Sequence, residues 1–177
     1  MKPAGGWLPL RPSAARSGIA PWLAERGSLT ARLRAHCAQF SLRRLCHGLG
    51  PARFDDPDCG APRLWRREVL LLADAKPVVF ARSVASREVL HDSWRLLRGL
   101  GGRPLGDAVF ARAGVRRTPI RVRRLRRGDP LQRAACRAAG LDADTELWAR
   151  RSAFVHRGAA VWVTEVFLPA LGALRPR

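Results

Sequence analysis

Two pairs of neighbouring strand-like segments constrain the fold of this chain more than any other feature. Residues 64–72 and 78–85 are rich in leucine, valine and other apolar side chains, and a short stretch separates them. Residues 147–156 and 161–168 form a second pair around a turn at Arg157 and Gly158. Such short connections join strands that run antiparallel. We therefore expect the core to be built on an antiparallel sheet.

The remaining segments add strands and helices to these two hairpins. Residues 40–47 and the arginine-rich stretch 116–127 predict two further strands, which makes about six in total. Helices are expected at 21–37 with a break at Gly27, at 86–97, in a short piece after Pro104, and at 130–139 before Gly140. Helices inserted between antiparallel strands define an α+β fold.

The length of 177 residues is that of one domain. We predict that this domain spans 21–171, after a flexible lead (1–20) and before a short tail (172–177). The lead lacks the apolar stretch of a secretion signal, and no apolar run is long enough to cross a bilayer. The sequence therefore predicts a cytoplasmic protein without membrane insertion, and a monomer, since nothing in it indicates an obligate interface.

Three charged residues fall on the apolar faces of the predicted strands. Side chains alternate between the two faces of a strand, so residues two apart share a face. A buried charge without a partner is costly, so each of the three is expected to have one. The charges and their apolar neighbours are Arg67 with Trp65, Val69 and Leu71, Arg82 with Phe80 and Val84, and Glu165 with Val163 and Phe167.

Two explanations fit these charges. One is a buried salt bridge between Glu165 and either Arg67 or Arg82. The other is a cavity on one face of the sheet, where an arginine grips a substrate carboxylate through two parallel hydrogen bonds. A carboxyl group in the same cavity then meets a hydroxyl or moves a proton. The second explanation describes a small enzyme that acts on an anionic substrate.

The net charge of +19 raises the possibility of nucleic-acid binding. However, two of the 33 basic residues are lysines and the other 31 are arginines, a ratio typical of genome-wide codon bias. Seven arginines lie within 116–127, interleaved with Ile120, Val122 and Leu125. This near-alternation predicts a strand with one solvated face. The alternative is a strand that binds nucleic acid, with an affinity that falls steeply with salt.

Motifs for metal binding and nucleophilic catalysis are missing from the sequence. The four cysteines form no C-x-x-C pair and have no histidine at metal-ligand spacing. The sequence also lacks the G-x-S-x-G, G-x-x-x-x-G-K and H-E-x-x-H motifs. We therefore expect neither a metal site nor a specific nucleic-acid partner.

Four stretches of the sequence together resemble the chorismate lyases. They are LWRREVLL at 64–71, GRPLG at 102–106, LWARRS at 147–152 and VTEVFLP at 163–169, in matching order and spacing across most of the chain. These enzymes turn chorismate into 4-hydroxybenzoate and pyruvate at the head of ubiquinone synthesis. The resemblance implies the same carbon–oxygen lyase activity, without a cofactor.

The resemblance also implies the site residues. Arg67 and Glu165 are the expected catalytic pair: Arg67 binds the ring carboxylate, and Glu165 meets the ring hydroxyl as proton acceptor or as orienting group. Leu105 of the P-L-G motif is expected to contact the ligand through its backbone. Leu29 stands at a further ligand contact, where the family usually has a methionine. From strand parity and charge, we predict that Arg82 lines the same cavity and serves the second carboxylate of chorismate.

The family buries its ligand beneath helical flaps, which map here to about 21–37 and 94–112. A different function on a similar fold is the ligand-sensing domain of bacterial transcription regulators. Such domains follow a winged-helix DNA reader, for which the roughly twenty residues before the first predicted helix leave no room. The lyase is therefore the preferred interpretation.

Overall fold

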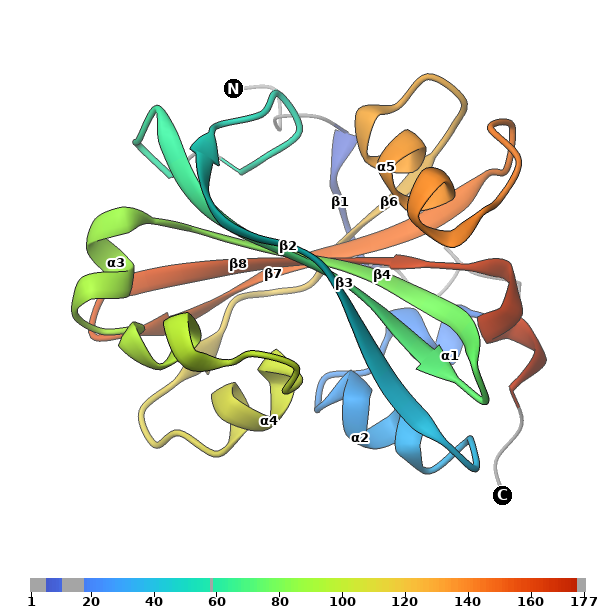
Figure 1. The fold of residues 1–177 in the computed structure, drawn as a ribbon, viewed down its shortest axis with the longest axis horizontal. Coiled ribbons are helices and arrows are strands. Elements are labelled where there is room, and N and C mark those ends of the chain that lie inside the picture. Colours follow the sequence, from blue (N-terminus) through green and yellow to red (C-terminus); the bar gives the residue numbers. More distant parts are fainter. Residues whose placement is uncertain (1–5, 11–17, 58, 175–177) are drawn as a thin grey trace.

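The computed structural model describes residues 6–10, 18–57 and 59–174 of the chain. Within them an antiparallel sheet of eight strands forms the middle of the molecule (Figure 1), which confirms the predicted α+β fold and adds two short strands to the expected six. The strand order is β1 (Leu8–Pro9), β6 (Arg121–Leu125), β7 (Leu147–His156), β8 (Ala159–Phe167), β4 (Lys76–Ser86), β3 (Arg63–Ala73) and β2 (Phe40–Pro51), and β5 (Arg116–Arg117) pairs with β7.

Both predicted hairpins are present and turn over two residues. Asp74 and Ala75 connect β3 to β4 with φ angles of 49° and 64°, and Arg157 and Gly158 connect β7 to β8 with φ angles of 50° and 76°. Two consecutive positive φ angles give the turn that matches the natural twist of paired strands. The Asp74 carboxylate also accepts hydrogen bonds from the backbone N–H groups of residues 38 and 39, both at 2.8 Å. This contact fixes the hairpin to the end of the preceding helical segment.

A β-bulge lies in the first hairpin and decides which side chains share a face. Ala73 pairs with Lys76 and Leu72 with Pro77, but Leu71 pairs with Val79, so Val78 is an extra residue on β4. Beyond the bulge, Arg67 is therefore opposite Ser83 and not opposite Arg82. Because directly opposed residues point to the same face, a shift of one residue moves a side chain to the other side of the sheet.

Helices cover both faces of the sheet (Figure 1). The helices α1 (Ala20–Leu23), α2 (Leu29–Arg34) and α4 (Leu105–Phe110), with the 3-10 turn η3 (Arg95–Gly99), lie on the face that we call the near face. The opposite face, the far face, is covered by α5 (Pro130–Ala139). The predicted helix at 86–97 is in fact two pieces, α3 (Arg87–His91) and η3, and a final 3-10 turn, η4 (Pro169–Ala173), follows β8.

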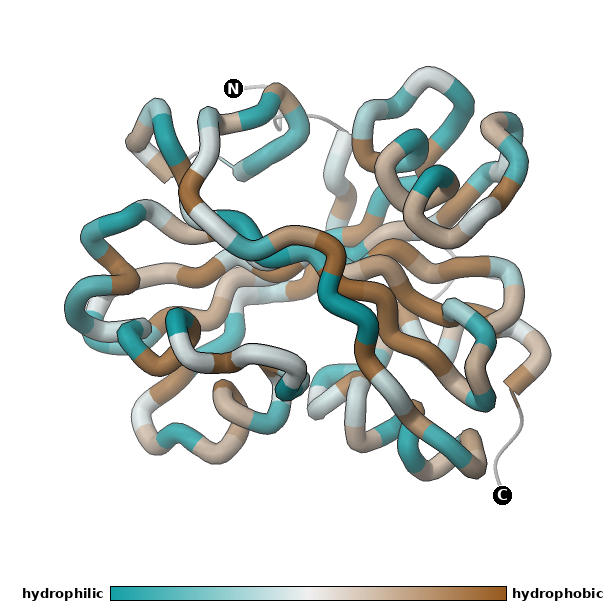
Figure 2. The backbone as a smooth tube through the Cα atoms, viewed as in Figure 1, coloured by the Kyte–Doolittle hydropathy of each residue, from teal (hydrophilic) through white to brown (hydrophobic). Residues whose placement is uncertain are grey.

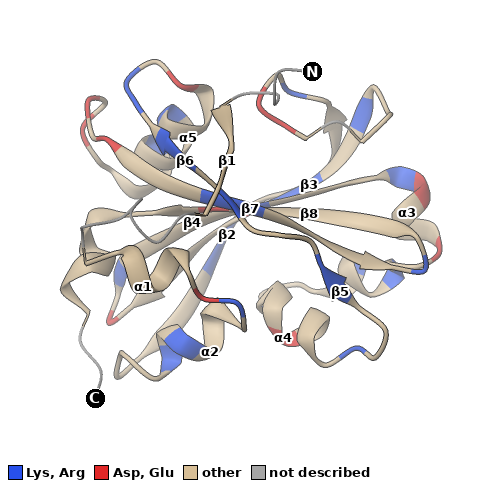
Figure 3. Cartoon of the chain, turned by 180° about the vertical axis from the view of Figure 1, so that it is seen from behind, with Lys and Arg blue, Asp and Glu red and all other residues tan. Residues whose placement is uncertain are grey.

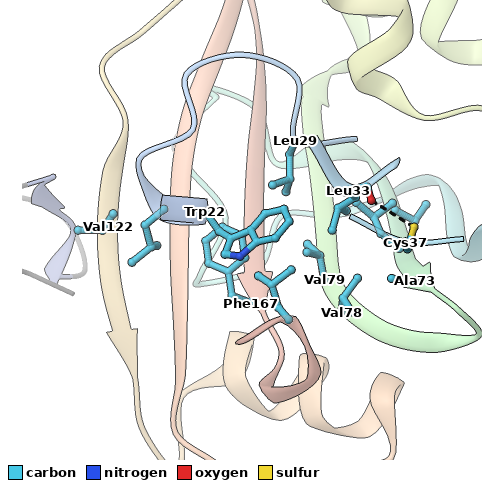
Figure 4. Close-up of a cluster of buried hydrophobic side chains, with 13 residues drawn as sticks. Trp22, Leu29, Leu33, Cys37, Ala73, Val78, Val79, Val122 and Phe167 are labelled. Atoms are coloured by element: carbon cyan, nitrogen blue, oxygen red, sulfur yellow. Dashed lines mark hydrogen bonds between the residues drawn. The ribbon is translucent and has the colours of Figure 1, made fainter. Parts of the chain in front are cut away.

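Three hydrophobic clusters hold the helices to the sheet, and hydrophobic residues recur along its strands (Figure 2). On the near face, Trp22, Leu29 and Leu33 of the α1–α2 segment pack against Val79 and Phe167 (Figure 4). A second near-face cluster joins α3, η3 and α4 to the other half of the sheet through Trp94, Leu97, Val109, Phe154 and Val163. The far-face cluster packs α5 through Leu131, Ala135 and Cys136 against Leu70 and Phe80. The near face thus has two apolar clusters with a space between them.

The predicted flexible lead differs from the structure at residues 6–10. Trp7 is buried in the far-face cluster, and Leu8 and Pro9 pair with β6. Residues 18 and 19 form a turn before α1, and residue 20 is the first residue of that helix. Residues 1–5 and 11–17 of the predicted lead lie outside the described residues. Of the predicted tail, residues 172 and 173 belong to η4, and 175–177 lie outside the described residues. Among the helices described, none combines the length and hydropathy needed to span a membrane.

The contact between α2 and α4 generates a first prediction. A Cβ atom added at Gly106 would lie 3.2 Å from the Ser28 hydroxyl, which caps α2, and 3.6 Å from the Thr30 hydroxyl. The added methyl group displaces the capping hydroxyl of Ser28, whereas alanine favours the helical conformation by about 0.5–1 kcal/mol over glycine. We expect Gly106→Ala to have a lower free energy of unfolding in urea than Gly99→Ala, because the Gly106 variant also disturbs the cap of α2.

Gly99→Ala is the matched control, since a Cβ atom there meets nothing within 4 Å. Equal stability of the two variants would show that the approach of α4 to α2 does not require the glycine.

Candidate active site

A cavity lies on the near face, between the two apolar clusters, and is lined by residues of both. Its floor consists of short side chains, Ala81 and Ser83 of β4 and Val163 of β8. The aromatic rings of Phe110 and Phe154 contribute to its wall.

Arg67 of β3 lies at one side of this cavity with only 2% of its surface exposed. Its Nη2 donates hydrogen bonds to the carbonyl oxygens of Gly101 (3.2 Å) and Arg103 (2.8 Å), while its Nε has no hydrogen-bond partner. No carboxylate of the described residues forms an ion pair with it. Burial, together with the nearby charge of Arg44, lowers the pKa of the Arg67 guanidinium. A buried cation in this state is a strong site for an anionic ligand.

Glu165 of β8 also lines the cavity, and its partner is an arginine that the sequence analysis did not consider. Its Oε2 accepts a hydrogen bond of 2.5 Å from Nε of Arg150, the residue directly opposite on β7. Nη2 of Arg117 is 3.6 Å from the same oxygen. The buried salt bridge considered from the sequence therefore exists, but with neither Arg67 nor Arg82.

Arg150 connects Glu165 to the covering segment of the cavity. Its side chain is almost fully buried, and its Nη1 donates to the carbonyl oxygens of Trp22 (2.9 Å) and Glu25 (2.6 Å) at the end of α1. Its Nη2 has no hydrogen-bond partner. One arginine thus binds both the site carboxylate and the polypeptide that closes the site.

Arg117 of the short strand β5 is the third arginine near Glu165. Its Nε donates to the Ser152 hydroxyl at 2.8 Å, and its Nη1 donates to the carbonyl oxygen of Arg26 at 3.1 Å. Burial lowers the pKa of Arg117, and the charge of Glu165 opposes this shift. The alternation of arginines in 116–127 predicted a strand with one solvated face for this residue. That interpretation fits Arg121 and Arg124, which are exposed, but not Arg117, which turns into the cavity.

The two predicted leucines lie where the covering helices begin. Leu29 is the first residue of α2 and Leu105 the first residue of α4, and both line the cavity. Backbone N–H groups in the first turn of a helix have no partner within that helix. The structure therefore brings four predicted residues, Arg67, Glu165, Leu29 and Leu105, to one cavity.

Arg82, the fifth predicted residue, does not reach this cavity. Its side chain lies on the far face, where Nε donates to Oε1 of Glu68 at 2.8 Å and Nη1 pairs with Asp55. Because the bulge at Val78 sets Ser83 opposite Arg67, Arg82 points to the other side of the sheet. The prediction that Arg82 lines the cavity is therefore wrong.

Arg82 belongs instead to a buried ion network on the far face. Asp55 and Asp56 reach the network from the loop after β2, and Asp56 pairs with Arg66. Arg151 donates to the carbonyl oxygen of Asp55 at 2.7 Å and to the Thr164 hydroxyl at 2.8 Å. Burial and the charge of Arg123 lower the pKa of Arg151 to about 10, so it stays protonated at neutral pH. Basic residues in the middle of the sheet are visible from behind in Figure 3.

Metal coordination has no obvious place in the described ranges. No three histidine, cysteine, aspartate or glutamate side chains gather there in a way that could hold a metal ion.

The overall fold is shared with effector domains of transcription regulators. The effector domain of PhnF from Mycobacterium smegmatis superposes with a TM-score of 0.57 at 13% sequence identity, over 81% of this chain and 90% of that chain. At this identity the likeness shows a common fold alone.

The sequence comparison is more specific. The profile of the chorismate lyase family matches residues 9–172, and the chain belongs to this family. A protein named "Probable chorismate pyruvate-lyase" in Aromatoleum aromaticum is 43% identical over 172 residues, which cover 93% of this chain and 92% of the relative. A protein of the same name in Thiobacillus denitrificans is 44% identical over 172 residues, 94% of this chain and 90% of the relative. The resemblance seen in the four sequence motifs is confirmed.

The far-face position of Arg82 generates the second prediction. Arg82→Met leaves Asp55 buried without its cation, and Glu68 with only the half-exposed Arg53, so we expect a loss of about 3–5 kcal/mol in the free energy of unfolding. The cavity lies on the opposite face, so the KM for chorismate, measured on folded protein, should stay within about threefold of the wild-type value.

Arg53→Met is the control, because Arg53 pairs with the same Glu68 at 3.0 Å but is 46% exposed. Its loss should cost less than about 1 kcal/mol. A stable Arg82→Met protein that no longer binds the ligand would contradict this assignment.

Proposed function

We propose that this protein is a chorismate pyruvate-lyase that converts chorismate into 4-hydroxybenzoate and pyruvate. We further propose that it acts as a cytoplasmic monomer and supplies the ring of ubiquinone. The observation that carries the proposal is Arg67, a buried guanidinium with no carboxylate partner among the described residues, in a cavity that also holds Glu165. The names of the relatives at 43% and 44% identity support the same activity.

The two charged residues suit the two ends of the ligand. Arg67 offers a fork of N–H donors that matches a ring carboxylate. The N–H groups of Leu29 and Leu105, at the starts of their helices, are further donors for this carboxylate. Glu165 accepts a hydrogen bond from the ring hydroxyl, so the hydroxyl end of the ring lies at Glu165 and the ring carboxylate at Arg67.

The reaction needs few chemical groups, because the ring of chorismate becomes aromatic when it loses its side chain. The carbon that carries the hydroxyl gives up its hydrogen as a proton. The ether bond between the neighbouring ring carbon and the side-chain oxygen breaks, and its electron pair leaves with the oxygen. The resulting enolpyruvate takes up one proton at carbon and becomes pyruvate, so the atoms of the two products add up to chorismate.

The protein contributes mainly position and charge to this step. It holds the ring, excludes water and stabilises the negative charge that develops on the leaving oxygen. Glu165 either accepts the ring proton, or orients the hydroxyl while the enolpyruvyl group takes the proton. Covering segments that are hydrogen-bonded to Arg67, Arg117 and Arg150 have to open before the product leaves, so we expect release to be a slow step.

Turnover of chorismate tests the proposal. We expect purified wild-type protein to release 4-hydroxybenzoate and pyruvate in equal amounts, followed by absorbance and by a coupled pyruvate assay. Glu165→Gln should remain folded and turn over more slowly. A loss of about 10²–10⁴-fold indicates that Glu165 accepts the proton, whereas a smaller loss indicates orientation of the hydroxyl.

Glu146→Gln is the matched control, since Glu146 is an exposed residue that forms a surface ion pair with Arg124. A folded wild-type sample without turnover refutes the lyase activity. Unchanged turnover in Glu165→Gln would mean that Glu165 is only a residue of the core.

A further inference from the structure

The substrate of the proposed reaction carries two carboxylates, one on the ring and one on the enolpyruvyl side chain. Arg67 serves the first, and Arg82 points to the far face. Of the described arginines, Arg67 and Arg117 line the cavity. We propose that Arg117 binds the second carboxylate and thereby selects a dianionic substrate. This assignment rests on the proposed lyase function.

Strand register places Arg67 and Ser152 at opposite ends of one row across the near face, and the side chain of Arg117, whose backbone pairs with Phe154, reaches the end of this row. Arg67 is opposite Ser83, Ser83 is opposite Val163, and Val163 is opposite Ser152. Arg117 is held at the end of this row by its hydrogen bond to the Ser152 hydroxyl. Three strand spacings separate the backbones of Arg67 and Ser152, about 14 Å in total. The two arginines therefore reach the same cavity from strands that are not neighbours.

Small side chains keep this row open. Ser83 and Val163 lie between the two arginines, and Ala81 lies beside them. Bulkier residues on β4 and β8 would fill the space that the ring requires. The cavity is therefore lined by two cations, Arg67 and Arg117, and Glu165 lies close to Arg117.

The hydrogen bonds of Arg117 leave one nitrogen suited to an anion. Nε and Nη1 are committed to Ser152 and to the carbonyl oxygen of Arg26. Nη2 is 3.6 Å from Glu165 Oε2, beyond normal hydrogen-bond length, and this oxygen is bound more closely by Arg150 at 2.5 Å. The guanidinium also lies over the ring of Phe154, 5.1 Å from its centroid, which fixes its plane. A carboxylate next to Glu165 then meets a cation that is already oriented.

Arg117 also lies between the cavity and the surface of the molecule. It lines a surface depression with Arg26, Thr118 and Ile120, and a second one with Arg112 and others. The carboxylate that it binds is the one that departs with pyruvate, since the other stays on the aromatic ring. Pyruvate is therefore formed next to an opening that carries further positive charge, while 4-hydroxybenzoate remains at Arg67.

A purely structural role for Arg117 makes a different prediction. Its bond to the carbonyl oxygen of Arg26 supports the segment between α1 and α2, which covers the cavity. If support of this segment were its only role, its loss would weaken every ligand of the cavity alike. A role in binding the second carboxylate affects chorismate, which has this group, much more than 4-hydroxybenzoate, which lacks it.

The experiment compares wild type, Arg117→Gln, Arg117→Lys and Arg116→Gln. For each, kcat/KM is measured with chorismate and the dissociation constant with 4-hydroxybenzoate. We expect Arg117→Gln to lower kcat/KM by about 10- to 100-fold, the usual effect of losing a charged hydrogen bond, and to change 4-hydroxybenzoate binding by less than about threefold. Arg117→Lys should recover much of the lost kcat/KM because it restores the charge. Arg116, the exposed neighbour on β5, should be replaceable without effect.

Three results would overturn the assignment: unchanged kcat/KM in Arg117→Gln, equal losses for the two ligands, or no recovery in Arg117→Lys. Failure of the lyase function itself gives a separate result. In that case the folded wild-type protein does not turn over chorismate at all, and the role of Arg117 falls with it.

Discussion

A guanidinium group buried on an apolar sheet needs hydrogen-bond acceptors, and this requirement organises the near face of the molecule. Arg67, Arg117 and Arg150 each donate to backbone carbonyl oxygens of a segment that covers the cavity. These carbonyls lie at the end of α1, in the connection to α2 and just before α4. The covering helices are all short, so their ends and connections supply acceptors where the arginines need them. The three arginines therefore hold the covering segments to the sheet and also give the cavity its positive charge.

Neighbouring residues on the central strands serve opposite faces of the sheet. Arg67, Arg150 and Glu165 lie on the near face, whereas Arg66, Arg151 and Thr164, each next to one of them in the sequence, join the far-face network. The far-face cations are paired with Asp55, Asp56 and Glu68 and stabilise the fold. On the near face, Glu165 is the carboxylate that lines the cavity, and Arg67 is left for a ligand. Side chains alternate between the two faces of each strand, and this alternation places the charges that stabilise the fold on the far face and those of the site on the near face.

The pattern of apolar and polar residues predicts most of the fold, because the spacing of apolar residues along a strand and the identity of turn residues are local properties of the sequence. It also identifies Arg67 and Glu165, whose neighbours along each strand are apolar. It fails for Arg82, because the faces of two strands are related only through their register, and the bulge at Val78 shifts this register by one residue. Arg117 lies on a strand of two residues, too short to show alternation. Arg150 lies on a strand that is buried along most of its length, where polarity does not mark the inner face.

The central claim is that Arg67 is kept for ligand binding and not for stability. The most direct measurement is the unfolding of Arg67→Met in urea without ligand, together with its affinity for 4-hydroxybenzoate. Methionine has a similar length and removes a buried charge that has no carboxylate partner in the described chain. We predict unchanged or higher stability and a loss of affinity of about 100-fold. A variant that is several kcal/mol less stable but binds the ligand as the wild type does would contradict the claim.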